Sequence, residues 1–100
     1  MRNPESALER ACSFGVRAIH LGGCVTGSPI HPGQPAAMRR RAHAHSYTGD
    51  PYLGTVCFKA HTLERVPDTL FWHEVAHIYR HSWTETQCDT WARRKVRAKP

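Results

Sequence analysis

Two histidines one helical turn apart are the side chains in this sequence best suited to chemistry. They belong to the run His73-Glu74-Val75-Ala76-His77, an H-E-x-x-H motif. On an α-helix, residues four apart lie on the same face, so both ring nitrogens can reach one cation. The carboxylate of Glu74 can then reach a water molecule on that cation. We therefore predict a zinc site with His73 and His77 as ligands and Glu74 as general base.

A third ligand must come from outside this motif, and three side chains are candidates. Glu85 opens a segment that has the pattern of a new helix, and Asp89 lies one turn further along it. His81 continues the spacing from His77, but three ligands along one straight helix span about 12 Å, too far for bonds of about 2 Å. We favour Glu85, with Asp89 accepting the outer N–H of a metal histidine. Asp89 and His81 are the alternative ligands, and one zinc ion per chain is predicted.

Such a site keeps an open position, as in hydrolytic zinc enzymes. Zinc lowers the pKa of bound water towards about 7, and Glu74 would pass a proton from that water to the leaving amine. A further side chain would contact the oxyanion or the substrate, and the sequence does not choose among its tyrosines and histidines. The candidates are Tyr52, Tyr79, His43, His45, His61 and His81.

Three segments resemble the gluzincin metallopeptidases, in particular the small IrrE-like and ImmA-like peptidases. Residues 69–81 (TLFWHEVAHIYRH) resemble their H-E-x-x-H region, and residues 85–92 (ETQCDTWA) resemble their E-x-x-x-D block. Residues 54–58 (GTVCF) resemble the strand before the metal helix, and the chain is similar in size to the minigluzincins. The match covers residues 54–92, whereas residues 1–50 match only in the order of elements. The short connection from His77 to Glu85, and Cys88 in place of the usual alanine, are departures.

The resemblance implies a small zinc-dependent endopeptidase that acts on a peptide or protein. Some relatives cut a phage or mobile-element repressor. The resemblance also implies that the strand Thr55, Val56, Cys57 and Phe58 is an open sheet edge that binds extended peptide through its main chain. Packing of this strand inside the sheet is the alternative. Two other functions are a catalytically idle zinc-binding or partner-binding module and a basic accessory protein that binds nucleic acid.

Composition places limits on these readings. A chain of 100 residues, 40% of them apolar, predicts a single domain over 1–100 with a small core. The net charge of +6 comes largely from basic runs at 39–41 and within 93–100. We expect these runs to be solvated or flexible rather than to bind nucleic acid, because no nucleic-acid module frames them.

Sequence patterns also predict where the chain resides. No apolar run approaches the roughly 18 residues of a membrane span, and residues 1–20 lack the apolar core of a signal peptide. We expect a cytoplasmic protein without membrane contact. The four cysteines form no C-x-x-C pair, so reduced, mostly buried thiols are expected, with a disulfide as the alternative.

The elements that must position the site follow from caps, turns and periodicity. A helix is predicted over 4–11, with Asn3 as N-cap and Pro4 as its first residue. Strands are predicted over 16–21, 43–47 and 55–60, separated by a loop over 22–35 and a turn over 48–51.

Two further helices complete the prediction. Asp68 is predicted to cap the metal helix, which residues 82–84 interrupt. Thr84 and Gln87 form a capping box for the last helix. Its apolar stripe comprises Cys88, Trp91, Ala92 and Val96. The predicted class is α+β: a small twisted antiparallel or mixed sheet of about three strands, packed on the metal helix, an N-terminal helix and a C-terminal helix.

Overall fold

Three helices and three strands make up the structure, a computed structural model that describes residues 3–27 and 42–97. The helices are α1 (Pro4–Ala11), α2 (Asp68–Tyr79) and α3 (Glu85–Arg97), and the strands are β1 (Ala18–Leu21), β2 (Ala42–Ala44) and β3 (Thr55–Phe58). Two 3₁₀ turns, η1 (Cys12–Phe14) and η3 (Leu63–Arg65), join them. The predicted α+β class is confirmed. The predicted loop beyond residue 27 and the basic residues at 39–41 and 98–100 lie outside the described residues.

The strands form one mixed sheet in the order β1-β3-β2, with β1 parallel and β2 antiparallel to β3. The central strand is thus β3, and the prediction that Thr55 to Phe58 form an open edge is wrong. All four residues of β3 are buried. The near-continuous apolar run Val56-Cys57-Phe58 is typical of a strand covered on both faces, which is the physical reason for its central place.

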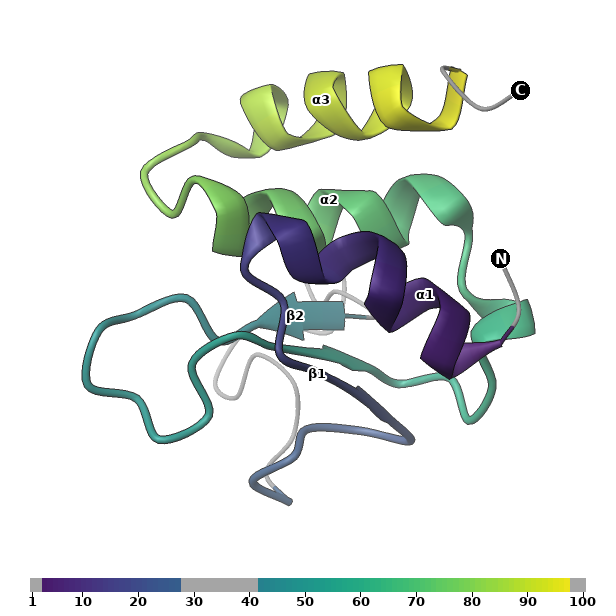
Figure 1. Ribbon diagram of the computed structural model, residues 1–100, viewed down its shortest axis with the longest axis vertical. Coiled ribbons are helices and arrows are strands. Elements are labelled where there is room, and N and C mark those ends of the chain that lie inside the picture. Colours follow the sequence, from purple (N-terminus) through teal and green to yellow (C-terminus); the bar gives the residue numbers. More distant parts are fainter. Residues whose placement is uncertain (1–2, 28–41, 98–100) are drawn as a thin grey trace, which may run out of the picture.

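Alternation along β3 divides the sheet into two differently covered faces. Val56 and Phe58 join the core cluster, and the ring of Phe58 stacks on Phe71 of α2 with centroids 5.9 Å apart. Cys57 points to the opposite face, because successive strand residues alternate. Figure 1 shows the three helices on one side of the sheet, with α2 between the sheet and α3, and the chain that follows β1 on the other side.

The predicted caps are confirmed at α1 and α3 and shifted by one residue at α2. The Asn3 carboxamide accepts hydrogen bonds from two first-turn N–H groups of α1, at 2.8 and 3.4 Å. Thr84 and Gln87 form the reciprocal pair of a capping box, at 2.8 and 3.1 Å. At α2 the N-cap is Pro67, so the Asp68 cap prediction is wrong. Asp68 is instead the first helical residue, where its carboxylate still faces the positive end of the helix dipole.

The strands are shorter than predicted, and beyond the ends of β1 and β3 the backbone continues in irregular hydrogen bonds. The Gly22 N–H donates to the Ala60 carbonyl at 2.8 Å, and the Gly23 N–H donates to the Phe58 carbonyl at 2.9 Å. The backbone therefore remains paired past the end of β1 without forming a regular strand. These bonds hold the turn that follows β1 against the end of β3.

Aromatic rings join α3 to α2. The ring of Trp91 on α3 stacks on Tyr79 at 5.5 Å and meets Trp72 and Phe14 edge-on, at 6.0 and 5.2 Å. Within the predicted stripe of α3, Cys88 and Ala92 are buried, whereas Trp91 and Val96 are partly buried. This contact fixes α3 along α2 and therefore fixes the first turn of α3 beside the H-E-x-x-H motif. None of the helices in the described part of the chain is long and apolar enough to cross a membrane.

Candidate metal centre

His73, His77 and Glu85 converge at one point between α2 and α3. The Nε2 atoms of the two histidines are 3.2 Å apart. Glu85 Oε1 lies 2.8 Å from His73 Nε2, and Glu85 Oε2 lies 3.1 Å from His77 Nε2. The helical spacing of the histidines and the capping box before Glu85 therefore bring together the three residues that the sequence predicted as ligands.

The separations among these three groups fit a cation. Bonds of about 2.0–2.1 Å to nitrogen or oxygen in tetrahedral geometry place neighbouring ligand atoms roughly 3.3 Å apart. The observed separations of 2.8 to 3.2 Å are close to that value. A simple histidine–carboxylate pair needs only one ring nitrogen, whereas here two ring nitrogens converge on one carboxylate. Three protein donors leave a fourth position for water or substrate.

Asp89 orients one of the histidines. Its Oδ1 atom lies 2.5 Å from His73 Nδ1. A proton on Nδ1 satisfies this contact and leaves the lone pair of Nε2 facing the convergence point. Asp89 therefore takes the place predicted for it as a partner of the outer ring nitrogen. It is one turn beyond Glu85 on α3, so a single helix supplies both carboxylates.

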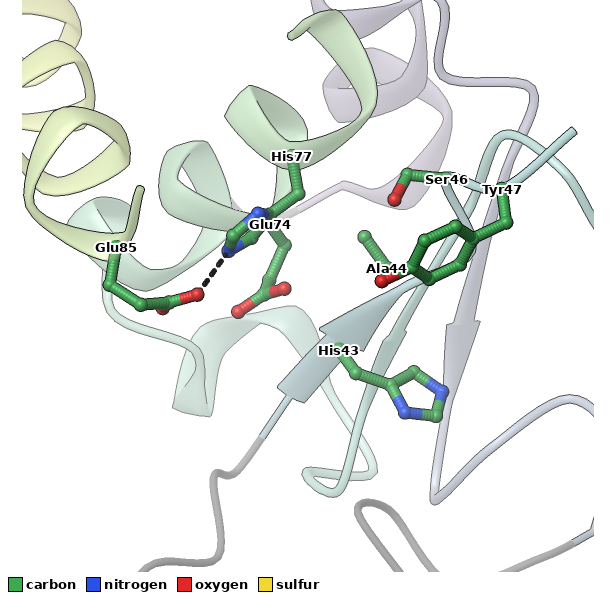
Figure 2. A pocket seen from close by; sticks show the side chains of 7 residues that line it. All are labelled: His43, Ala44, Ser46, Tyr47, Glu74, His77 and Glu85. Atoms are coloured by element: carbon green, nitrogen blue, oxygen red, sulfur yellow. Dashed lines mark ion pairs between the residues drawn. The ribbon is translucent and has the colours of Figure 1, made fainter. Parts of the chain in front are cut away.

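Glu74 is buried beside this group. Only 1% of its surface is exposed, and it lines a cavity of about 320 Å³ together with His77 and Glu85. The opposite wall of the cavity is formed by β2 and the residues after it. Figure 2 shows the Glu74 carboxylate beside the His77–Glu85 pair. A buried carboxylate next to a potential metal position is suited to accept a proton there.

Most of the predicted oxyanion candidates lie elsewhere. His81 is exposed and follows the end of α2, and the ring of Tyr79 packs on aromatic neighbours between α2 and α3. Tyr52 contacts His45, with ring centroids 5.8 Å apart, on the far side of β2. Among the candidates, His43 alone lines the cavity. Its ring points away from the Glu74 carboxylate (Figure 2).

Three further residues line the cavity wall and were not predicted. They are Ala44, Ser46 and Tyr47, on β2 and just after it. Tyr47 is 75% exposed. Their role could not be read from local sequence, because it depends on β2 being the edge strand nearest to α2. Recognition of Thr55 to Phe58 as a doubly covered strand would have moved attention to the preceding strand.

A second group of potential metal ligands was also missed. Cys24, His43, His45 and Cys57 each offer one ligand atom, and these atoms all lie within 4.8 Å of one another. Burial raises the pKa of the Cys57 thiol to about 11. Burial acts in the same direction on Cys24, but hydrogen bonds from Thr26 and from His45 outweigh it and lower its pKa. The two cysteines thus have unlike environments within one cluster.

The cysteines were predicted to be mostly buried. Cys24, Cys57 and Cys88 are buried, whereas Cys12 is exposed.

No known protein family, curated protein or solved structure matches the chain. The gluzincin resemblance therefore remains a prediction, and the functional reading depends on the residues and their geometry.

Proposed function

We propose that the protein is a small zinc-dependent endopeptidase. The observation that carries the proposal is the convergence of His73, His77 and Glu85 within 3.2 Å of one another, with the buried Glu74 beside them at an open cavity. Two imidazoles and one carboxylate with a free fourth position are the donor set of catalytic zinc sites. A purely structural site would use a fourth protein ligand and would have no need of Glu74.

Each residue around the site has a separate role in the proposed reaction. His73, His77 and Glu85 would hold a zinc ion, which would supply the Lewis acidity that lowers the pKa of a water molecule and polarises a peptide carbonyl. Glu74 accepts the proton of the attacking water and delivers it to the nitrogen of the leaving amine. Asp89 holds His73 in the tautomer that presents Nε2. Burial of Glu74 keeps its carboxylate in place between these two proton transfers.

The substrate in this proposal lies along β2 rather than β3. The His45 N–H donates to the Thr55 carbonyl at 2.9 Å, and the His45 carbonyl accepts from the Gly54 N–H at 2.8 Å. Both polar backbone groups of His45 therefore point towards β3. Because these directions alternate in an antiparallel strand, the N–H and C=O of Ala44 point to the open edge. Ala44 lines the cavity, so an extended peptide bonded to it would cross the metal position.

The experiment that tests the proposal separates metal binding from turnover. Glu74→Gln is nearly isosteric but cannot take a proton. We expect the variant to keep its zinc and to hydrolyse a library of internally quenched peptides about 10²- to 10⁴-fold more slowly than the unmodified chain. His81→Gln is the matched control, because this exposed histidine lies outside the cavity. Equal hydrolysis by the Glu74→Gln variant would remove Glu74 from the mechanism, and absence of any hydrolysis by the unmodified zinc-loaded chain would count against peptidase function.

A further inference from the structure

We propose that Cys24, His43, His45 and Cys57 form a second metal site, a closed structural zinc site on the sheet face opposite the helices. Its four ligands differ from the three of the proposed catalytic site, although His43 also lines the cavity beside that site. The four side chains come from three segments that the fold brings together. Their ligand atoms all lie within 4.8 Å of one another, close enough to surround a single ion.

The separations within this group have the size expected for zinc ligands. His43 Nε2 lies 3.2 Å and His45 Nε2 lies 3.6 Å from Cys24 Sγ. Zinc bonds of about 2.0–2.1 Å to nitrogen and about 2.3 Å to sulfur place tetrahedral neighbours roughly 3.6 Å apart. The Thr26 hydroxyl oxygen also lies 3.1 Å from Cys24 Sγ. A single cation would accommodate the sulfur and both imidazole nitrogens at the observed separations.

Strand geometry places three of the four ligands. His43 and His45 are two residues apart and so lie on the same face of the sheet. His43 is also the antiparallel partner of Cys57 on β3, which makes the two side chains direct neighbours. The rings of His43 and His45 are 4.9 Å apart and nearly perpendicular. Such an arrangement lets both Nε2 atoms approach one point without ring overlap.

Cys24 lies in the turn after β1. The backbone bonds from Gly22 and Gly23 to the end of β3 hold this turn against the sheet. The His20 ring adds a contact of 2.8 Å to the Gly23 carbonyl. Cys24 is thereby 7% exposed and packs on Cys57, which is fully buried. The fourth ligand is thus positioned by hydrogen bonds that are independent of the metal.

Asp50 contacts Nδ1 of His45, in the same way that Asp89 contacts Nδ1 of His73. Its Oδ2 atom lies 2.8 Å from His45 Nδ1, and its Oδ1 atom accepts the Tyr52 N–H at 2.8 Å. A carboxylate on the outer ring nitrogen fixes the tautomer in which Nε2 faces the metal. The hydrogen bond from the Tyr52 N–H holds the Asp50 side chain in position. The group therefore includes the outer partner that metal-binding histidines usually have.

The donor set predicts both the ion and its role. Two cysteine sulfurs and two imidazoles are a structural zinc set, because soft thiolates select zinc over hard cations such as magnesium. Four protein donors leave no position for water, so the site has no hydrolytic chemistry. The proposed site would cross-link the turn that carries Cys24 to β2 and β3, on the sheet face opposite α1, α2 and α3. Such a cross-link adds stability to a domain with a small core.

Metal stoichiometry and cobalt spectroscopy test this site. The chain, purified under reducing conditions, should bind two equivalents of zinc. The double variant His73→Ala with His77→Ala should retain one equivalent. After replacement by Co²⁺, that variant should show the thiolate-to-cobalt charge-transfer band and the intense visible bands of tetrahedral cobalt. The double variant Cys24→Ser with Cys57→Ser should also retain one equivalent but lack the charge-transfer band. Cys12→Ser, at an exposed thiol, is the matched control and should retain two.

Two outcomes would overturn the proposal. One is a single equivalent in the unmodified chain that disappears in the His73 and His77 double variant. The other is a cobalt spectrum of that variant without the charge-transfer band. Because this variant keeps all four proposed ligands, the test holds even if the cysteine variants fail to fold. Asp50→Asn should weaken zinc binding at this site by about 10- to 100-fold, and unchanged affinity would contradict the orienting contact. Failure of this site would leave the Glu74→Gln experiment unaffected.

Discussion

Each of the two proposed metal sites has a carboxylate that contacts the outer ring nitrogen of a candidate metal histidine. Asp89 contacts the outer nitrogen of His73, and Asp50 contacts the outer nitrogen of His45. Both are on the surface side of a more buried ring: the side chain of Asp89 is 57% exposed, whereas that of His73 is 6% exposed. At the residue scale, each centre is thus built outward from a buried imidazole to a solvated carboxylate.

The order of effects at the catalytic centre is a prediction at this scale. Glu85→Ala should weaken zinc binding far more than His81→Ala, because Glu85 contacts both histidines and His81 is exposed beyond α2. Asp89→Asn should have an intermediate effect and lower the zinc affinity by about 10- to 100-fold. Competition with a fluorescent chelator measures all three in a Cys24→Ser, Cys57→Ser background that isolates this centre. If His81→Ala lost more zinc affinity than the other two variants, α2 would have to end earlier in solution than in this structure.

At the scale of elements, the start of α3 decides where Glu85 lies. Thr84→Ala removes a capping-box bond and should destabilise the chain by about 1 kcal/mol. It should also weaken zinc binding, since Glu85 follows the cap directly. Thr90→Ala is the control, because the exposed Thr90 hydroxyl only donates to the Thr86 carbonyl within α3. This variant should change the free energy of unfolding by no more than about 0.5 kcal/mol. Urea unfolding with and without zinc separates the two effects. Equal stability of the two variants would mean that the capping box contributes little in solution.

The edge strand β2 allows a test of substrate placement. Ala44→Pro removes an N–H that points away from β3, and proline is tolerated at such edge positions. We expect the folded structure and the zinc content to persist while KM for peptides rises several-fold. Circular dichroism and metal analysis provide the check on folding. An unchanged KM would mean that substrate does not pair with β2, and unfolding would mean that the Ala44 N–H belongs to the sheet.

The sequence predicted the helices more reliably than the sheet, for a physical reason. The cap at Asn3, the capping box at Thr84 and the two histidines on α2 are local patterns, readable within one turn of helix. Whether β3 is central or at an edge depends on which strands flank it, and one of these, β1, lies far away in sequence. The second metal group was missed for the same reason. Cys24 and Cys57 are widely separated, and only the β2–β3 register brings His43 beside Cys57.

At the scale of the whole molecule, the two proposed metals should each contribute to stability. Binding that is restricted to the folded state stabilises by about 2.7 kcal/mol when free zinc is 100 times Kd. For a domain of this size, that raises Tm by roughly 10–20 °C per site. Calorimetry of the unmodified chain and of the two double variants, with zinc and with a chelator, measures each contribution. The prediction is contradicted if zinc leaves the Tm of the His73→Ala, His77→Ala variant unchanged.

The strand order sets the sequence of events by which the chain can fold. Among the described residues, β1 and β2 are not paired with each other; each pairs with β3, which is synthesised after both. During synthesis, the pairing of β1 and of β2 with β3 cannot form until residues 55–58 have emerged. Closure of the parallel β1–β3 pair then brings distant parts of the chain together at once, a slow step by comparison with helix formation. The proposed site of Cys24, His43, His45 and Cys57 can therefore form only after β3 has joined the sheet, because Cys57 belongs to this strand.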